Sequence, residues 1–211
     1  MINEMWTVFI NKKELFLKLL IEHIQISLMA IGIALIIGLL TGILISEFKK
    51  ISKIVMCVIN FIYTIPSISM LGFLIPLSGI GDTTAIIALT IYALLPMVRN
   101  THTGLTNVNP MLIEAATGMG STRIQTLVKI KLPLAMPIII AGLRNMAVMT
   151  IALAGIASFI GAGGLGVAIY RGITTNNKGM TLAGSLLIAI LAIIVDFIIG
   201  VLERQTQKHK V

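Results

Sequence analysis

Charged and aromatic side chains are scarce in this sequence of 211 residues. Only 11% of the residues are charged and 5% are aromatic, whereas 57% are hydrophobic. A soluble domain contains about 25% charged and roughly 45–50% apolar residues. The composition therefore excludes an ordinary soluble domain, and the mean hydropathy of +1.02 indicates an integral membrane protein.

Cysteine and clustered positive charge are also missing. Cys57 is the only cysteine, so an intrachain disulfide and a paired-cysteine metal motif are both excluded. The net charge of +8 comes from basic residues that stand singly between apolar runs. Nucleic-acid binding requires a clustered basic face. We therefore expect no nucleic-acid partner and no metal site.

Long apolar segments are abundant instead. A helix needs about 20 mainly apolar residues to cross the hydrocarbon core of a membrane. The alternation with period two that a membrane barrel requires does not occur over segments of the necessary length. The sequence predicts an all-α integral membrane protein with about five transmembrane helices, at residues 24–46, 53–76, 83–99, 133–160 and 180–202.

Prolines interrupt two of these spans. Pro66 and Pro76 in the second span and Pro96 in the third should kink or end their helices, because proline donates no backbone hydrogen bond. Ser67 and Ser69 stand beside the first kink. Their hydroxyl groups either face a pore or bond to their own helix.

The N-terminal residues 1–22 have a mixed pattern. Glu4 precedes any basic residue and no small-x-small cleavage site follows an apolar core, which argues against a cleaved signal peptide. Apolar residues from Trp6 to Leu20 alternate with Asn11 and with lysines. This pattern predicts an amphipathic segment in the membrane interface, with an unstructured tail as the alternative.

Basic residues are divided unevenly between the two sides of the predicted spans. Ten lysines and arginines fall on the side of residues 99–132, and five on the side of the N-terminus. By the positive-inside rule, the side with more of them is cytoplasmic. We therefore expect the N-terminus outside the cell and the C-terminal tail, 205–211, inside. Residues 99–132 then form one large cytoplasmic segment.

This cytoplasmic segment contains helix signals. Asn109 suits the cap of a helix and Pro110 its first helical position. Gly118 and Gly120 interrupt the pattern, and Gly120 is expected to adopt a positive φ angle. Ser121 is suited to cap a second short helix. Apolar residues at helical spacing form one stripe, at Leu105, Val108, Leu112, Ala116 and Met119.

The same segment carries an extended motif. It reads Glu-Ala-Ala, three residues, Gly, nine residues, Ile, one residue and Leu-Pro, at Glu114, Ala115, Ala116, Gly120, Ile130, Leu132 and Pro133. At every fixed position it resembles the signature of ABC importer permeases. The resemblance implies a type I ABC importer (MetI-like) permease fold over residues 23–204, in which residues 105–131 form a cytoplasmic coupling helix. It implies that this helix, Gly118 included, docks into a groove of an ATPase subunit that accommodates its small alanines.

Further stretches resemble the osmoprotectant subfamily of these permeases. They are Glu22-His23, Thr64-Ile65-Pro66-Ser67, Tyr92-Ala93-Leu94-Leu95-Pro96 and the glycine-rich stretch 160–166. The resemblance implies import of glycine betaine, choline, carnitine or related quaternary ammonium compounds. It also implies three protein partners: the ATPase, a second permease that is an identical copy or a paralogue, and a separate extracellular substrate-binding protein.

Two other functions are alternatives. One is an ABC permease for an amino acid such as methionine, and the other is an ion-coupled secondary transporter. The sequence contains no G-x-x-x-x-G-K-[ST] loop, so we expect no cofactor on this chain. ATP and Mg²⁺ are expected on the ATPase partner, and this chain is expected to be a transport subunit and not an enzyme.

The glycine-rich stretch formally fits the dinucleotide motif G-x-G-x-x-G at Gly161, Gly163 and Gly166. That motif binds a dinucleotide only where it follows a strand and opens a helix. Here it follows a predicted membrane span. We therefore expect these glycines, together with Gly164, to form a tight external loop.

Arg144 and Asp196 lie inside predicted spans that run in opposite directions. Charges within a membrane normally face a partner or a watery cavity. Three arrangements remain open: a structural ion pair, positions on the translocation path, or separate solvated positions. Tyr92 and the two serines of the second span are further polar candidates for a pore.

Aromatic residues in the spans are dispersed over four predicted helices. They are Phe61, Tyr63, Phe73, Tyr92, Phe159 and Phe197. A quaternary ammonium ion is usually bound against aromatic faces. We therefore expect the high-affinity site on the binding protein and only weak binding by this chain.

Overall fold

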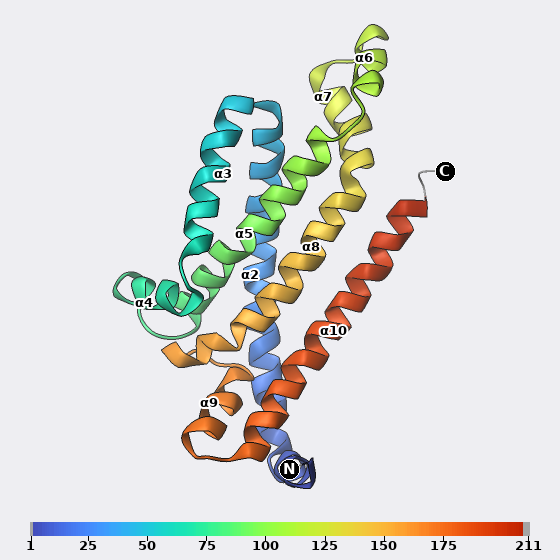
Figure 1. Ribbon diagram of the computed structural model, residues 1–211. Coiled ribbons are helices and arrows are strands. Elements are labelled where there is room, and N and C mark those ends of the chain that lie inside the picture. The colour runs from blue at the N-terminus through green and yellow to red at the C-terminus, as the bar shows by residue number, and fades with distance from the viewer. Residues whose placement is uncertain (1, 209–211) are drawn as a thin grey trace.

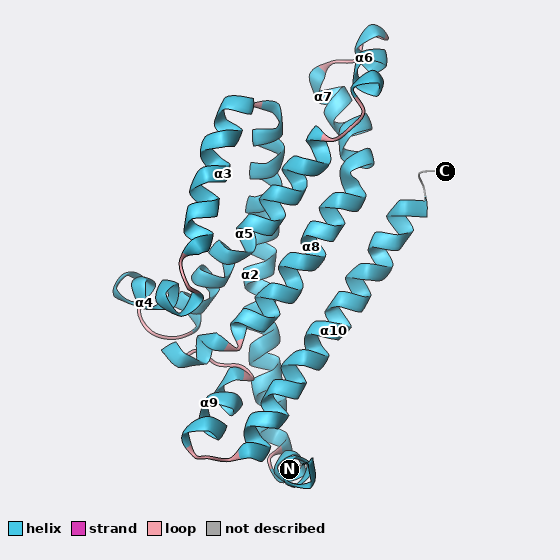
Figure 2. Ribbon diagram, viewed as in Figure 1, coloured by secondary structure: helices cyan, strands magenta, loops and turns pink. Residues whose placement is uncertain are grey.

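The computed structural model describes residues 2–208, and all regular structure in this part of the chain is helical (Figure 2). The long helices are α2 (Lys13–Glu47), α5 (Asp82–Thr106), α8 (Leu132–Ala154) and α10 (Lys178–Lys208). Shorter helices are α1 (Ile2–Asn11), α3 (Lys49–Thr64), α4 (Ser67–Ser78), α6 (Pro110–Gly118), α7 (Arg123–Thr126), the π-helix η1 (Leu127–Lys131), the 3₁₀-helix η2 (Ile156–Ile160) and α9 (Gly166–Thr174). The predicted all-α class is confirmed.

The long helices form one bundle. α5 and α8 lie at its centre, α2 packs behind both of them, α3 packs on α5 and α10 packs on α8 (Figure 1). α6 and α7 project from one end of the bundle, and α1, α9 and η2 lie toward the other. We call these the α6 end and the α9 end.

Two glycines bring α2 and α5 close together. A Cβ atom at Gly38 would lie 2.8 Å from the Met97 Cβ, and one at Gly42 would lie 2.5 Å from the Thr101 Cβ. In lipid, helices associate through close packing of their surfaces, because the lipid tails are as apolar as the side chains. These two glycines therefore determine how α2 and α5 fit against each other.

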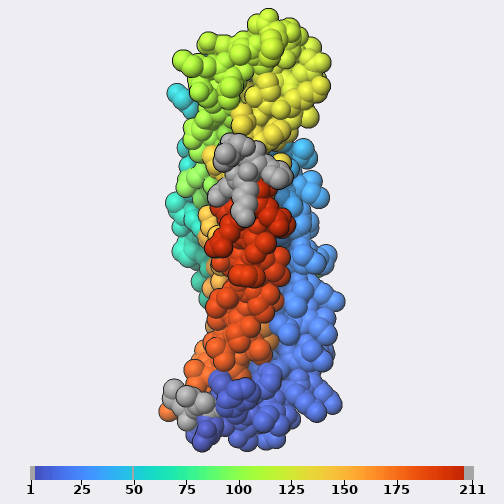
Figure 3. All heavy atoms as spheres, turned by 90° about the vertical axis from the view of Figure 1, so that its right-hand side faces the viewer, coloured from blue at the N-terminus to red at the C-terminus, as the bar shows by residue number. Residues whose placement is uncertain are grey.

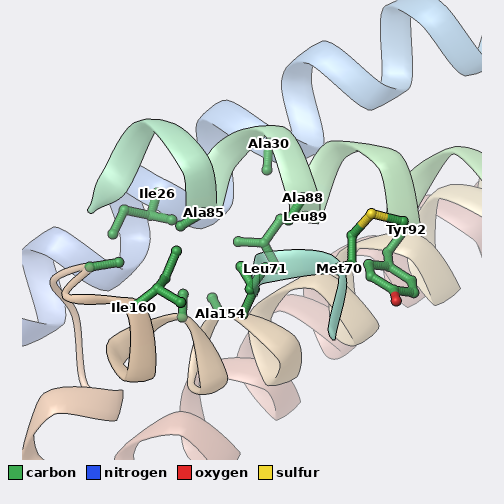
Figure 4. Packing of buried hydrophobic residues seen from close by; sticks show 12 residues of the cluster. Ile26, Ala30, Met70, Leu71, Ala85, Ala88, Leu89, Tyr92, Ala154 and Ile160 are labelled. Atoms are coloured by element: carbon green, nitrogen blue, oxygen red, sulfur yellow. The ribbon is translucent and has the colours of Figure 1, made fainter. Parts of the chain in front are cut away.

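The second predicted span, 53–76, is not a straight helix. α3 and α4 meet at an angle of 99° across a break at Ile65 and Pro66. Proline disfavours a helical conformation in the preceding residue, and Ile65 is extended, with a ψ angle of 127°. The break directs α4 against α5, so that Met70 and Leu71 enter a buried cluster (Figure 4). Within residues 2–208, four helices are long and apolar enough to span a membrane, or five spans if this bent pair counts as one.

The other two prolines do not end their helices where the sequence suggests. Pro76 lies inside α4, close to its end, and α5 continues past Pro96 to Thr106. α5 has 25 residues, so the predicted third span, 83–99, is too short. The lost hydrogen bond of Pro96 is tolerated because α5 packs between α2, α3 and α8.

The N-terminal segment divides differently from the prediction. α1 is a separate short helix, whereas residues 13–22 already belong to α2, which continues through the predicted first span. Trp6 is 54% exposed and Phe16 only 2%. α1 packs on α10 and lies across the α9 end (Figure 3). Its position at a membrane interface stays a prediction.

α10 is the most exposed of the long helices. None of the residues in its most apolar window is buried, and Figure 3 shows it along one face of the molecule. Large apolar side chains cover it, among them Ile193, Phe197 and Ile198. A helix with such a surface requires lipid or another protein around it.

Candidate functional site

The first candidate site is the helix pair at the α6 end. The Asn109 side chain accepts a hydrogen bond of 3.0 Å from the Met111 N–H, and Pro110 is the first residue of α6, as predicted. Gly120 has a φ angle of +86°, also as predicted. The expected cap at Ser121 is wrong, because α7 begins at Arg123 and its N-cap position is therefore Thr122, one residue later.

Thr122 caps α7 instead. Its hydroxyl group accepts a bond of 3.3 Å from the Gln125 N–H, and the Gln125 side chain accepts one of 2.9 Å from the Thr122 N–H. The two bonds form a capping box, which satisfies two N–H groups at the start of the helix. α6 and α7 are therefore two short, individually capped helices joined by a glycine turn.

The residues of the Glu-Ala-Ala motif face different ways. Glu114 and Ala115 are exposed, whereas Ala116 is only 1% exposed because it packs within its own chain. Ala115 is therefore the only alanine of the motif that a partner can contact directly. The predicted apolar stripe is split in the same way, since Leu112 and Met119 are exposed while its other members are buried.

Exposed apolar side chains gather on this helix pair. Met111, Met119 and Ile124 are 75%, 81% and 74% exposed. On a protein surface that faces water, such a concentration of apolar side chains marks an interaction site. This surface, with Leu112 at its edge, is called the α6–α7 surface below.

The rest of the motif lies where this helix pair joins the bundle. Ile130 is in the π-helix η1, Leu132 begins α8, and Pro133 follows with no N–H to donate. The Leu132 N–H donates to the carbonyl group of Leu127, five residues back, which is the π-helical pattern. The Lys131 ammonium group lies 2.6 Å from Glu47 at the end of α2. The junction is thereby attached to two long helices.

The second candidate site surrounds Arg144. Its guanidinium group donates two hydrogen bonds of 2.6 Å to the carboxylate of Asp196 and a third of 3.2 Å to Glu203. Of the three arrangements left open by the sequence, the structure shows the ion pair. Glu203 is a partner that the sequence does not suggest, because it lies two helical turns beyond Asp196, past the predicted end of the span.

A cavity of about 360 Å³ adjoins this ion pair, between α3, α5, α8 and α10. We call it the central cleft. It is lined by Tyr63 of α3, by Leu95, Pro96, Arg99 and Asn100 of α5, by Asn145, Val148 and Met149 of α8, and by Asp196 of α10. Asp196 therefore both pairs with Arg144 and lines the cleft, whereas Ser67 and Ser69 do not line it.

Two tyrosines from different helices meet at the cleft. The rings of Tyr63 and Tyr92 are 5.8 Å apart in an edge-to-face arrangement, and the Tyr63 hydroxyl group donates to the Met149 sulfur at 3.8 Å. The Tyr92 hydroxyl group donates to the carbonyl group of Ile65, at the break before α4. The aromatic residues are thus less dispersed than the sequence suggests.

Arg99 is the principal cleft residue that sequence reasoning missed. The sequence indicates the end of a span there, but α5 continues to Thr106 and keeps Arg99 within the bundle. Its guanidinium group donates to the side-chain oxygen of Asn60 on α3 at 2.7 Å. The sequence does contain one signal that α5 continues. Arg99 and Asn100 lie one helical turn after Pro96, and no glycine or proline ends the helix between them.

The third candidate site is the glycine-rich loop at the α9 end. The Gly163 N–H donates to Asp82 at 2.8 Å, and the Gly164 N–H donates to Glu22 at 3.1 Å. Beside them, His23 is fully buried and its Nε2 atom lies 3.0 Å from the carbonyl oxygen of Ile151. The loop follows a 3₁₀-helix and no strand, so it lacks the context of a dinucleotide site.

Tight packing explains the last glycine of the loop. A Cβ atom at Gly166 would lie 2.0 Å from the carbonyl oxygen of Gly155, which belongs to the backbone and cannot rotate away. Gly161 and Gly164 have positive φ angles of +76° and +91°. The loop therefore packs against three parts of the bundle. These are the first turn of α5, the N-terminal half of α2 and the end of α8.

Comparison with known proteins gives consistent results. The carnitine transport permease protein OpuCB of Listeria monocytogenes is 42% identical, over 86% of this chain and 84% of that protein. The choline transport system permease protein OpuBB of Bacillus subtilis is 39% identical, over 87% and 85%. The osmoprotectant import permease protein OsmW of Salmonella typhimurium is 41% identical, over 86% and 87%.

A solved structure agrees with these relatives. The inward-facing MetNI methionine ABC transporter matches with a TM-score of 0.86 at 25% identity, over 93% of this chain and 98% of the matched chain. The family model described as "Binding-protein-dependent transport system inner membrane component" matches residues 34–208. The chain thus belongs to the family of inner-membrane components of binding-protein-dependent transport systems, as its Glu-Ala-Ala motif and helical bundle indicate.

Proposed function

We propose that this chain is the membrane-spanning permease subunit of an ATP-driven ABC importer for quaternary ammonium osmoprotectants such as glycine betaine, choline and carnitine. The observation that carries the substrate class is the similarity, at about 40% identity and over most of each chain, to permeases whose names specify these compounds. The solved methionine transporter is more distant in sequence, so an amino-acid substrate is less well supported. Family membership also argues against an ion-coupled secondary transporter.

The α6–α7 surface supports docking to a separate ATPase subunit. Glu114 and Ala115 lie exposed between the apolar side chains of Met111 and Met119. A small residue flanked by large apolar ones lets α6 enter a groove while its neighbours cover the groove walls. ATP and Mg²⁺ would bind on that ATPase, and its movements would reach the bundle through η1 and α8.

The same proposal gives the orientation and the remaining partners. The α6 end lies in the cytoplasm, and the α9 end, with α1 and the N-terminus, lies outside the bacterial cell membrane. A separate substrate-binding protein delivers substrate to the α9 end. A second permease, identical or paralogous, covers part of the exposed apolar surface, and alternating access of the paired subunits moves the substrate.

Transport in proteoliposomes tests the substrate class. The permease is reconstituted with its ATPase and binding protein, and uptake of radiolabelled glycine betaine, choline, carnitine and methionine is measured with and without ATP. We expect saturable, ATP-dependent uptake of at least one quaternary ammonium compound and none of methionine. ATP-dependent uptake of methionine alone would refute the proposal.

Docking and orientation need separate measurements. Ile124→Glu should reduce co-purification of the ATPase, whereas Ile173→Glu, at an exposed position of the α9 end, should leave it unchanged.

In a Cys57→Ser background, Asn176→Cys should react with an impermeant maleimide added to intact cells, and Ser121→Cys should not. The reverse labelling pattern would contradict the orientation.

A further inference from the structure

We infer that the central cleft is a substrate site of the permease itself, selective for zwitterionic quaternary ammonium carboxylates. In this site the substrate carboxylate binds Arg99 and the quaternary ammonium group lies on the ring of Tyr63. The inference rests on the proposed function, because it specifies which chemical form of the substrate the permease recognises.

Arg99 provides the anion-binding wall. Its side chain is exposed to the cleft, its one hydrogen bond is to the amide oxygen of Asn60, and it makes no ion pair with any residue in 2–208. A guanidinium group has five N–H donors in a planar arrangement that matches a carboxylate. Most of these donors remain available, so a carboxylate in the cleft would supply the missing partner.

The other charged groups beside the cleft are paired with one another. Arg144 contributes one positive charge, whereas its two partners, Asp196 and Glu203, contribute two negative charges, so the cluster has a net charge of −1. Asp196 is the member that lines the cleft. Both oxygens of Asp196 are bonded to Arg144, and the excess negative charge of the cluster lies at Glu203, which does not line the cleft. Arg99 is therefore the unpaired charge among the lining residues, and it suits a ligand that carries a carboxylate better than a simple cation.

Tyr63 provides the surface for the quaternary ammonium group. A tetraalkylated nitrogen has no N–H to donate, and it is attracted to the negative face of an aromatic ring. The edge contact with Tyr92 and the hydroxyl contact with Met149 hold the Tyr63 ring in position. One face of the ring can then be presented to the cleft that this residue lines.

The two groups are the right distance apart for a small zwitterion. Asn60 and Tyr63 are three residues apart on α3, so they are neighbours on its surface with Cβ atoms roughly 5–6 Å apart. Arg99 is held at Asn60, and therefore lies about one helical turn from the Tyr63 ring. Glycine betaine has only one carbon between its ammonium and carboxylate groups, and it can span this short separation.

Choline would bind less well in such a cleft. It has a hydroxyl group where glycine betaine has a carboxylate, so it cannot neutralise Arg99. Hydrogen bonds between charged groups contribute more than neutral ones, and we expect a preference for glycine betaine of about tenfold or more. Carnitine, which has a carboxylate, should resemble glycine betaine.

Protection of a cysteine in the cleft tests this inference without transport. Asn145→Cys is introduced in a Cys57→Ser background, and the purified permease–ATPase complex in lipid nanodiscs is labelled with a small maleimide. The concentration of glycine betaine, carnitine, choline or tetramethylammonium that halves the labelling rate is measured. We expect half-protection by glycine betaine at a concentration about tenfold or more below that of choline.

Variants of the two walls separate recognition from a structural role. Arg99→Gln should raise the half-protecting concentration of glycine betaine to that of choline and leave choline unchanged, whereas Arg171→Gln, at the exposed end of α9, should change neither. Tyr63→Leu should weaken all four ligands together, and Tyr63→Phe should be milder because the ring remains. Equal protection by glycine betaine and choline in the parent, or unchanged protection in Arg99→Gln, would overturn the inference.

Failure of the cleft site can be distinguished from failure of the proposed function. ATP-dependent uptake of a quaternary ammonium compound together with no selective protection would refute the cleft site and leave the proposed function intact. Uptake of methionine alone would refute the proposed function, and the cleft site with it.

Discussion

Two glycine-containing turns at opposite ends of the molecule are constrained in different ways. At the α6 end, a Cβ atom on Gly118 or Gly120 would meet nothing within 4 Å, and only the φ angle of +86° at Gly120 requires glycine. At the α9 end, a Cβ atom on Gly163 would lie 2.7 Å from the Glu22 carboxylate, and one on Gly166 would lie 2.0 Å from a backbone oxygen.

The contrast shows what each turn does. The turn between α6 and α7 is open on all sides, so its conformation is local and its surface remains available to another protein. The loop 161–166 is covered by its own chain, and its amide groups are bonded to carboxylates of Asp82 and Glu22. The first turn fits the proposed docking of a partner, whereas the second holds the α9 end of the bundle together.

The largest effect should come from adding one methyl group at the closed loop. Gly166→Ala places a Cβ against the carbonyl oxygen of Gly155, and overpacking of this kind costs about 1–3 kcal/mol or more. We expect a lower melting temperature in detergent and a smaller monodisperse fraction after size-exclusion chromatography. Gly32→Ala, where a Cβ atom meets nothing within 4 Å, is the matched control. Equal melting temperatures for the two variants would show that the loop accommodates the added Cβ atom without loss of stability.

The next largest effect is expected at Gly120, where a substitution should reduce transport without preventing folding. Gly120→Val forces a β-branched residue into the left-handed region, at a local cost of about 1–2 kcal/mol, and should change the angle between α6 and α7. We expect normal insertion in the membrane but loss of ATP-dependent uptake. Gly120→Asn, which tolerates this conformation, should retain most of the uptake. Full uptake in the valine variant would mean that the turn does not set the docking geometry.

A smaller effect is expected from the carboxylates that hold the closed loop. Glu22→Gln keeps an oxygen acceptor for the Gly164 N–H but removes its charge, at a cost of about 1 kcal/mol. Hydrogen–deuterium exchange of residues 161–166 should become faster, with little change in melting temperature. Glu14→Gln, at an exposed position of the same helix, should leave the exchange unchanged. Unaltered exchange in Glu22→Gln would assign the rigidity of the loop to packing alone.

The smallest effect is expected at the open turn. Gly118→Ala adds a Cβ atom that meets nothing within 4 Å, and alanine favours a helix by up to about 1 kcal/mol. Uptake and co-purification of the ATPase should stay within experimental error. A marked loss of either would show that the bound partner approaches the backbone of α6 at this point, which would sharpen the contrast between the two turns.

Much of this molecule is predictable from sequence because the signals are local. The helical class follows from the length and composition of the apolar runs, and the cap at Asn109 and the positive φ angle at Gly120 follow from the preferences of single residue types. The break at Pro66 is local too, since proline restricts itself and its predecessor. The coupling motif is recognisable for the same reason, because its fixed residues lie within twenty positions.

The central cleft and the closed loop depend on tertiary contacts between residues that lie far apart in the sequence. No local pattern shows that Arg99 of α5 lies beside Asn60 of α3, or that Glu203 completes the charges around Arg144. The burial of Ala116 and the exposure of Ala115 likewise depend on how α6 packs against the rest of the chain. Helix propensity and periodicity determine which segments form helices and which faces are apolar. Which side chains meet depends on how closely the helices pack, and that is determined by the shapes of residues far apart in the chain.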